Sequence, residues 1–277
     1  MLKFAKYHAL GNSFIVLDEL PPKKPKKDLE NLAIELCDSS FGVGADGIII
    51  LSDSKKADYN FDIYNADGSW AEKSGNGLRC VGLHLYLNRK RKKCTIETTN
   101  SIDEVIFDNQ IKPEYFFKTT LGTPEFDTGL IPVKTKQKYL INSPMKVSGY
   151  NFPMTCLSIG NPHAVLFVNK FDFDWQVLGE EIENLSQFPN RTNVEFVKIV
   201  TKKKIKVKDW ERGAGPTGSS GTGAAASVVA GVMNGQLDRE CQVDFEKGSL
   251  YINWHSDNDI VELSGPVEFI CKGTYNI

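Results

Sequence analysis

The sequence predicts an α/β (α+β) protein of two pseudo-symmetric lobes, each a β-rich sheet around a central helix. Three observations predict this fold class. The chain has 277 residues, which is enough for two domains with a substantial core. Strand-like and helix-like apolar patterns recur in the same order in both halves. Finally, Ser74–Gly77 and Ser220–Gly223 both read Ser-Gly-x-Gly ahead of an apolar run, at an offset of 146 residues.

The repetition extends beyond these two loops. The other matched features, at offsets of 146 to 149 residues, are Gly11–Leu17 with Gly160–Leu166, Asp28 with Asp174, and Ile48–Leu51 with Val194–Val197. A single Ser-Gly-x-Gly is ordinary turn chemistry. Four features in one order at nearly one spacing instead indicate an internal duplication of about half the chain, a much longer period than that of solenoid repeats.

The elements of the first half follow in order. Asp28 is the predicted N-cap of a helix, because an apolar stripe at helical spacing runs from Leu29 to Cys37. Ile48–Leu51 predicts a strand, and Tyr59, Phe61 and Ile63 alternate with polar residues as in another strand. A helix is expected from about Gly75, and successive strands from Cys94 to about Leu121.

The second half repeats this plan. Strands are expected from Leu157 to Val168 and from Asn193 to Trp210, helices from Asp174 and from Gly221 through Ala230, and final strands at Val243, Leu250 and Val261. We therefore expect an N-terminal lobe of residues 1–118 and a C-terminal lobe of residues 119–264. The C-terminal tail, residues 265–277, is expected to pack on the first lobe.

Composition and charge exclude several classes of protein. A formal net charge of −2 gives no sign of a nucleic-acid or membrane-surface partner. Met1–Lys6 shows no signal-peptide hydrophobic region, and no apolar stretch is long enough to span a bilayer. The six cysteines are scattered, without a Cys-x-x-Cys pair or clustered histidines. We expect a cytoplasmic protein with reduced, mostly buried thiols and no metal site.

A dinucleotide site is also excluded. Gly42–Gly47 satisfies the glycine-rich pattern of such sites, but it follows a predicted helix and leads into a strand. The pattern requires the reverse context, a strand leading into a helix. No nucleotide is therefore expected at this segment.

The two Ser-Gly-x-Gly loops are the candidate site. A helix N-terminus presents unpaired N–H groups and partial positive charge, and glycine allows a ligand to approach the backbone closely. Pseudo-twofold related lobes would bring Ser74 and Ser220 face to face across a cleft. Two such termini could hold one carboxylate and stabilise an enolate-like species, while groups from opposite lobes address opposite faces of one carbon.

The chain also resembles a known family, the diaminopimelate epimerases. The segments that carry the resemblance, in the family's order and over nearly the whole chain, are Gly11-Asn12, Phe41–Gly47, Tyr64–Ser69, Gly75–Cys80, Gly160–His163, Asn193 and Glu211–Gly215. The resemblance implies a two-lobed fold and a homodimer. It also implies an isomerase of lysine and cell-wall precursor synthesis that removes and returns a proton at the α-carbon of a diamino dicarboxylic acid, without a cofactor.

The resemblance implies roles for particular residues. Positions matched to groups that grip the substrate's amino and carboxylate groups are Asn12, Asn65, Asn161, Asn193, Glu211 and Arg212. Positions matched to the loops that cradle the reacting carboxylate are Gly75, Asn76, Gly221 and Thr222. The catalytic candidates are Ser74 and Ser220 at the acid/base positions, His163 beside that pair, and Glu211 behind it.

Four positions depart from the family pattern. Ser74 and Ser220 stand where the family has its two acid/base cysteines, Ser13 replaces a usual aspartate, and Pro216 replaces a usual acidic residue. A thiol pKa of about 8.5 can fall to roughly 3.5–7.5 at a helix N-terminus, whereas a serine hydroxyl is a very poor base without a partner. We therefore expect weak epimerase activity from this sequence as it stands.

Two explanations of the serines remain, engineering to trap substrate or natural divergence. Ser13 and Pro216 have no place in a trapping design and favour divergence. The functions that remain open beside the epimerase are a related racemase, a one-base proton-shift isomerase or dehydratase that uses Glu211 or His163, and a catalytically silent amino-acid-binding protein.

Overall fold

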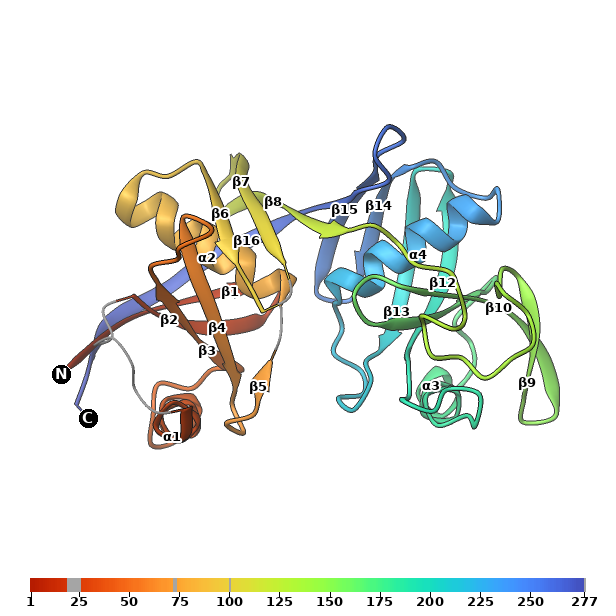
Figure 1. Ribbon diagram of the computed structural model, residues 1–277, viewed down its shortest axis with the longest axis horizontal. Coiled ribbons are helices and arrows are strands. Elements are labelled where there is room, and N and C mark those ends of the chain that lie inside the picture. Colours follow the sequence, from red (N-terminus) through yellow and green to blue (C-terminus); the bar gives the residue numbers. More distant parts are fainter. Residues whose placement is uncertain (19–25, 72–73, 100, 277) are drawn as a thin grey trace. The chain divides into compact units, whose positions relative to one another are not determined.

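The computed structural model describes residues 1–18, 26–71, 74–99 and 101–276 (Figure 1). The chain divides into two compact units, which we describe separately. Unit 1 comprises residues 1–120 and 264–277, and unit 2 comprises residues 121–263.

Unit 1 is a set of strands around a buried helix, α2 (Gly75–Arg89). Its strands pair in the order β1-β2-β3-β4-β6-β7-β8-β16, and β16 also pairs with β1. Their bounds are β1 (Leu2–Ala9), β2 (Asn12–Leu17), β3 (Gly47–Ser52), β4 (Tyr59–Asn65), β6 (Lys93–Glu97), β7 (Ile102–Ile111), β8 (Glu114–Gly122) and β16 (Val261–Tyr275), with the short β5 (Trp70–Ala71) beside β4. Both β8 and β16 continue past the limits of unit 1.

The burial of α2 explains its composition. Every residue from Gly77 to Leu85 is buried, so the helix is enclosed on all sides and carries no polar stripe. Gly82 is required by this packing, since a Cβ there would lie 2.6 Å from Cγ1 of Val105.

The strand β3 explains why an unbroken apolar run forms a strand. Ile49 and Leu51 belong to the core around α2, whereas Ile48 and Ile50 pack with α1 (Lys26–Cys37). Because successive strand residues point to opposite faces, a strand covered by a helix on each face must be apolar throughout.

The predicted N-cap of α1 is wrong. The helix already includes Lys26, so Asp28 is its third residue and lies in the first turn. An acidic residue in the first turn still interacts favourably with the helix dipole, which explains its position there.

Unit 2 repeats the plan of unit 1 around α4 (Gly221–Met233), which is buried from Gly223 to Gly231. Its strands are β9 (Ser143–Val147), β10 (Tyr150–Ser158), β11 (Pro162–Phe167), β12 (Asn193–Thr201), β13 (Lys204–Trp210), β14 (Glu240–Phe245) and β15 (Gly248–Trp254). They pair in chain order, and the outer helix α3 (Trp175–Glu183) contacts β12 and β13.

Strand pairing confirms the internal duplication. The parallel pair β2–β3 aligns Phe14 with Gly47, and the parallel pair β11–β12 aligns His163 with Asn193. These residues correspond at offsets of 149 and 146, the offsets found in the sequence. The helices α2 and α4 also begin 146 residues apart.

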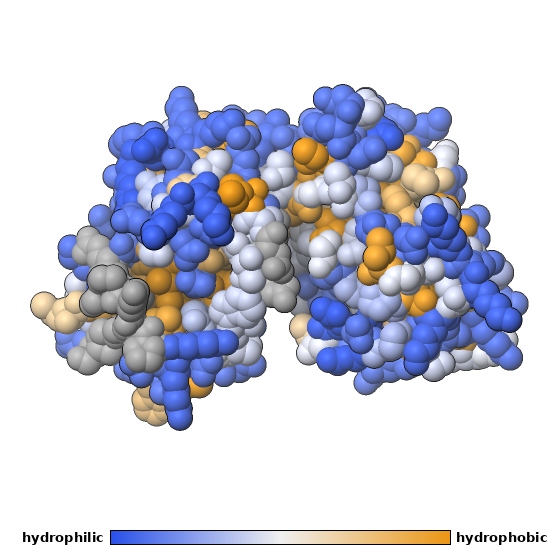
Figure 2. All heavy atoms as spheres, viewed as in Figure 1, coloured by the Kyte–Doolittle hydropathy of each residue, from blue (hydrophilic) through white to orange (hydrophobic). Residues whose placement is uncertain are grey.

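The surface in view is mainly hydrophilic, with scattered apolar side chains (Figure 2). Within the described residues, no helix has both the length and the apolar character needed to cross a membrane. All six cysteines are free thiols, and five of them are buried, as the sequence predicts.

Candidate functional site

The predicted site residues fall into two half-sites, one in each unit. Unit 1 holds Asn12, Asn65, Ser74, Gly75 and Asn76, and unit 2 holds Asn161, His163, Asn193, Glu211, Arg212, Ser220, Gly221 and Thr222. Each half-site is described within its own unit.

The same capping geometry opens the central helix of each unit. Ser74 is the N-cap of α2, with φ −143° and ψ 118°, and its Oγ accepts a hydrogen bond from the Gly77 N–H at 3.0 Å. Ser220 is the N-cap of α4, with φ −132° and ψ 126°, and its Oγ accepts from the Gly223 N–H at 3.2 Å. Neither helix has an acidic residue in its first turn, so no side chain there offsets the positive end of the dipole.

In unit 1, a chain of hydrogen bonds orders the loop ahead of α2. The Asn76 amide donates to Oδ1 of Asn12 at 3.1 Å. The buried Arg79 donates through one nitrogen to Oδ1 of Asn76 at 2.5 Å and through another to the Gly75 carbonyl at 3.3 Å. One hydrogen-bonded cluster at the helix N-terminus therefore contains Asn12, Asn76 and Arg79.

Arg79 is a site-region residue that sequence reasoning missed. Burial lowers the pKa of its guanidinium to about 10, so it stays charged near neutral pH. Its Nε is buried without a hydrogen-bond partner in the described part of the chain. The available signal was a charged residue inside the apolar run Leu78–Leu83, three positions after Asn76.

Asn65 is not joined to this cluster. It is exposed at the end of β4, and its amide donates to Oγ of Ser69 at 2.9 Å. Nearby, the N–H and Oγ of Ser13 both donate to Oδ2 of Asp46, at 2.6 and 3.0 Å. Ser13 is therefore held by two hydrogen bonds to one carboxylate oxygen.

In unit 2, His163 lies between two partners. Its Nδ1 is 2.7 Å from Oε1 of Glu195, and its Nε2 is 2.8 Å from Oδ1 of Asn161. Both ring nitrogens are therefore occupied, and within the described residues neither makes a hydrogen bond to Ser220. The structure joins two of the predicted residues, His163 and Asn161, but it does not support His163 as a direct partner of Ser220.

Glu195 is a second missed residue, and it lies at the start of α4. It is 1% exposed, and a Cβ on Gly223 would be 2.9 Å from its Oε1 and 3.1 Å from Oγ of Ser220. Burial raises the pKa of its carboxyl, and the neighbouring His163 opposes that rise. The signal in the sequence was a lone carboxylate inside the apolar strand Val194–Val197.

Asn193 connects two segments of backbone. Its amide donates to the Pro162 carbonyl at 2.8 Å, and its Oδ1 accepts from the Arg212 N–H at 2.9 Å. The exposed Arg212 side chain donates to the carbonyl of Asn190 at 3.3 Å. The Asn193 amide keeps a second hydrogen for a ligand.

Glu211 is paired with residues that the sequence did not suggest. Oγ1 of Thr217 bonds Oε1 of Glu211 and, at 2.6 Å, Oδ2 of the buried Asp209. Burial raises the pKa of both carboxyls, that of Glu211 to about 7. A carboxyl group that titrates near neutral pH is suited to acid/base work.

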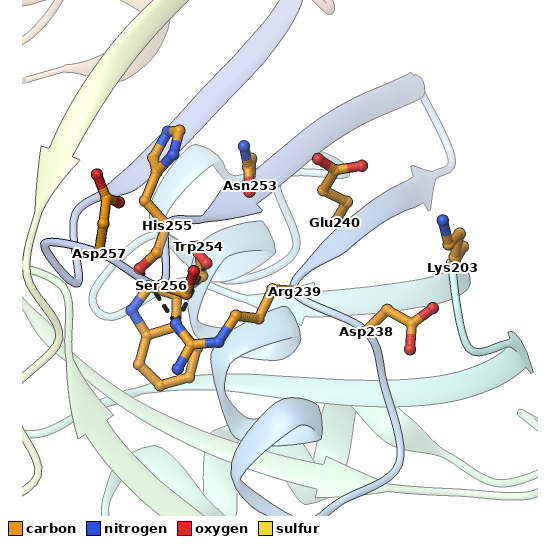
Figure 3. A pocket seen from close by; sticks show the side chains of 9 residues that line it. All are labelled: Lys203, Asp238, Arg239, Glu240, Asn253, Trp254, His255, Ser256 and Asp257. Carbon is orange, nitrogen blue, oxygen red and sulfur yellow. Dashed lines mark hydrogen bonds between the residues drawn. The ribbon is translucent and has the colours of Figure 1, made fainter.

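A separate cavity of about 440 Å³ lies elsewhere in unit 2 (Figure 3). It is lined by Lys203 and by residues 238–240 and 253–257, and none of the predicted site residues contributes to it. Arg239 stacks on the Trp254 ring at 4.1 Å and donates hydrogen bonds to the carbonyls of Trp254 and His255. Its guanidinium group is therefore already bonded to residues of the cavity wall. No cluster of metal-ligating side chains occurs in the described residues.

Comparisons with known proteins give the same family that the sequence motifs resemble. The family model described as diaminopimelate epimerase matches residues 4–123 and 155–270. Proteins named diaminopimelate epimerase are 38% identical to this chain in Pelotomaculum thermopropionicum and 41% identical in Carboxydothermus hydrogenoformans, over 280 residues and 99% of both chains in each case.

Solved structures support the fold. A probable proline racemase from Agrobacterium radiobacter superposes with a TM-score of 0.70 at 15% identity, covering 100% of this chain and 93% of the other. A PhzF-family phenazine biosynthesis protein from Bacillus anthracis gives 0.65 at 17% identity, covering 100% and 99%. The segments, the duplicated caps and the full-length matches lead to one conclusion: the chain belongs to the diaminopimelate epimerase family of cofactor-independent isomerases.

Proposed function

We propose that this protein interconverts LL- and meso-diaminopimelate in lysine and cell-wall precursor synthesis. One group breaks the α-C–H bond and takes the proton, and a group on the opposite face of the carbon returns a proton to it. The observation that carries the proposal is the pair of identically capped helix N-termini, at Ser74 and at Ser220, one in each repeat of the fold. Full-length similarity to proteins named diaminopimelate epimerase supports the choice of substrate.

We propose that the helix N-termini and the polar residues named for each unit bind the substrate. The N–H groups at Gly75, Asn76, Gly221 and Thr222 bind the reacting carboxylate, because a helix N-terminus favours an anion. The polar groups proposed to hold the amino groups and the distal carboxylate are Asn12, Asn65, Asn161, Asn193, Glu211 and Arg212. The bonded chain Asn12–Asn76–Arg79 supports this scheme, since it fixes the amide orientation before a ligand arrives.

The serines limit the rate in this scheme. A positioned acid/base group contributes roughly 10²- to 10⁴-fold, and a hydroxyl that cannot ionise near neutral pH forfeits most of that. We expect the Ser74→Cys, Ser220→Cys double variant to epimerise substrate faster by several orders of magnitude. A matched control is Ser186→Cys, which adds an exposed thiol at a residue that is not among the predicted site residues. No gain in the double variant would remove the epimerase proposal.

Heavy water separates the epimerase from the open alternatives. The protein is incubated with LL- and meso-diaminopimelate in deuterium oxide, and α-deuteration and inversion are followed. Deuteration with inversion supports the epimerase. Exchange without inversion supports one-base chemistry, and binding without exchange supports a silent amino-acid-binding protein.

We propose that the serines are native. The fit of Ser13 against Asp46 supports natural divergence, because it places another departure from the family pattern in a satisfied hydrogen-bonded position. The encoding gene in the source organism tests this directly, since cysteine codons at positions 74 and 220 would show that the serines were introduced.

We also propose a cytoplasmic homodimer. Exposed apolar side chains on β16, Phe269 and Ile270, support an interface on that strand. Sedimentation equilibrium of the wild type and of Ile270→Glu tests it: a dimer that the variant converts to monomer is expected, and a monomeric wild type would contradict it. Fractionation of the source cells tests the location.

A further inference from the structure

The region between β13 and α4 contains a hydroxyl shared by two carboxyl groups. Asp209 and Glu211 stand at and just beyond the end of β13, and Thr217 precedes α4. Oγ1 of Thr217 lies 2.6 Å from Oδ2 of Asp209, is also bonded to Oε1 of Glu211, and lies 3.5 Å from the carbonyl of Ser219.

The number of hydrogens available on Thr217 limits the protonation states of the Asp209 and Glu211 carboxyls. A hydroxyl carries one hydrogen, so Thr217 can donate to only one of the two carboxylates. The second contact is a hydrogen bond only if that carboxyl is itself protonated and donates to Oγ1. Two ionised carboxylates would instead leave a buried carboxylate oxygen against a hydroxyl lone pair, which is unfavourable.

The surroundings favour the same state. Asp209 is 2% exposed, and neither Asp209 nor Glu211 forms a salt bridge in the described residues. The charged groups that act on Glu211 are Asp209, Glu195 and His163, and those that act on Asp209 are Lys208 and Lys247. Burial raises the pKa of both carboxyls, so holding one proton between them relieves the charge.

We propose that Asp209 and Glu211 share one proton through Thr217, and that this pair is the acid/base group of unit 2 in place of a titrating side chain at position 220. The inference rests on the proposed function and names the group that performs half of it. Glu211 is the member proposed to meet the substrate, while Asp209 and Thr217 are positioning residues.

The transfer balances in both directions. As acid, Glu211 gives its carboxyl hydrogen to the α-carbon of the enolate-like species, forming the C–H bond and becoming a carboxylate. As base, it takes the α-hydrogen and leaves the electron pair on the substrate. Before the transfer, a proton that rests on Asp209 can reach Glu211, because Asp209 gives its hydrogen to Oγ1 while Thr217 passes its own hydrogen to Glu211, which leaves the threonine unchanged. After Glu211 has given this proton to carbon, both carboxyls are ionised, and the pair regains its one proton from solvent or from the α-carbon of another substrate molecule.

The first test needs no activity. Carboxyl carbons are labelled with ¹³C in aspartate and glutamate, and their chemical shifts are followed by NMR from pH 4 to 9. We expect one carboxyl signal that titrates near neutral pH, is lost in Glu211→Gln, and moves toward the ordinary range in Asp209→Asn, where the neighbouring charge is removed. Thr217→Val should move this signal to higher pH, because the hydrogen bond from Thr217 lowers the pKa of both carboxyls. Thr217→Ser keeps the hydroxyl and should keep the signal, and Glu246→Gln, at an exposed salt bridge to Lys208, is the control. Ordinary titration of both carboxyls would overturn the shared proton.

The second test separates this inference from the proposed function. In deuterium oxide we expect Asp209→Asn and Thr217→Val to slow α-deuteration at least 10-fold and to shift its pH profile, with little change in substrate affinity, while Thr217→Ser retains the rate. Wild-type exchange that these variants do not alter would overturn the acid/base role. So would absent wild-type exchange alongside an active Ser74→Cys, Ser220→Cys variant, whereas inactivity of that double variant as well would count against the proposed function itself.

Discussion

Glu211→Gln should change how the stability of unit 2 depends on pH. Burial raises the pKa of the Glu211 carboxyl from 4.5 to about 7 in the folded protein. Each unit of difference in pKa corresponds to about 1.4 kcal/mol. The rise therefore means that the folded protein favours the protonated form of Glu211 over the ionised form by roughly 3 kcal/mol more than the unfolded chain does. A neutral glutamine of the same shape removes this contribution.

The sign follows from proton binding. Between pH 4.5 and about 7 the folded state holds a proton on Glu211 that the unfolded state has lost. The wild type therefore has its full Glu211 contribution below pH 4.5 and loses it as the pH rises through 7. The reference is the difference in the free energy of unfolding between the variant and the wild type at pH 4. By pH 8 we expect the free energy of unfolding of the variant to have gained roughly 3 kcal/mol relative to that of the wild type.

Urea unfolding at several pH values measures this difference. Tryptophan fluorescence is a suitable probe, because Trp175, Trp210 and Trp254 all lie in unit 2. The control is Glu246→Gln: the hydrogen bond from Lys208 lowers the pKa of that carboxyl, so its replacement should not raise stability with pH. Curves for the wild type and Glu211→Gln that stay parallel from pH 4 to 8 would refute the reasoning.

Three further predictions concern local structure. Ser74→Ala should lower the free energy of unfolding by about 1 kcal/mol in urea titration, because the Gly77 N–H loses its cap, and an unchanged midpoint would contradict this. Gly82→Ala should lower it by about 1–3 kcal/mol despite alanine's higher helix propensity, since the new Cβ would meet Val105 at 2.6 Å; equal or greater thermal stability would show that the core has room. Ellman's reagent should titrate one thiol, Cys271, in the native protein and six in denaturant, because burial raises the pKa of the other five thiols to about 12; rapid native reaction of more than one would count against their burial.

The local features of this protein were predictable from its sequence. The capping serines, the starts of α2 and α4 and the duplication at 146 to 149 residues all depend on neighbouring residues or on direct repetition. The error at Asp28 has the same origin, because a capping residue and a first-turn acidic residue favour the same end of a helix and differ by only one turn. Family membership followed from motifs that lie within short segments.

Partnership among buried polar groups was decided only by the tertiary structure. Glu195 alternates with Val194 and Phe196 in β12, so strand geometry turns it toward α4, where it meets His163 from another strand. Thr217 likewise bonds Asp209 in β13 and Glu211 just beyond it, only because the loop folds back on the end of that strand. The sequence by itself determined where helices begin, where strands repeat and which family these repeats belong to. The fold decided which charges are buried together, because burial and proton sharing depend on contacts between residues that are far apart in the chain.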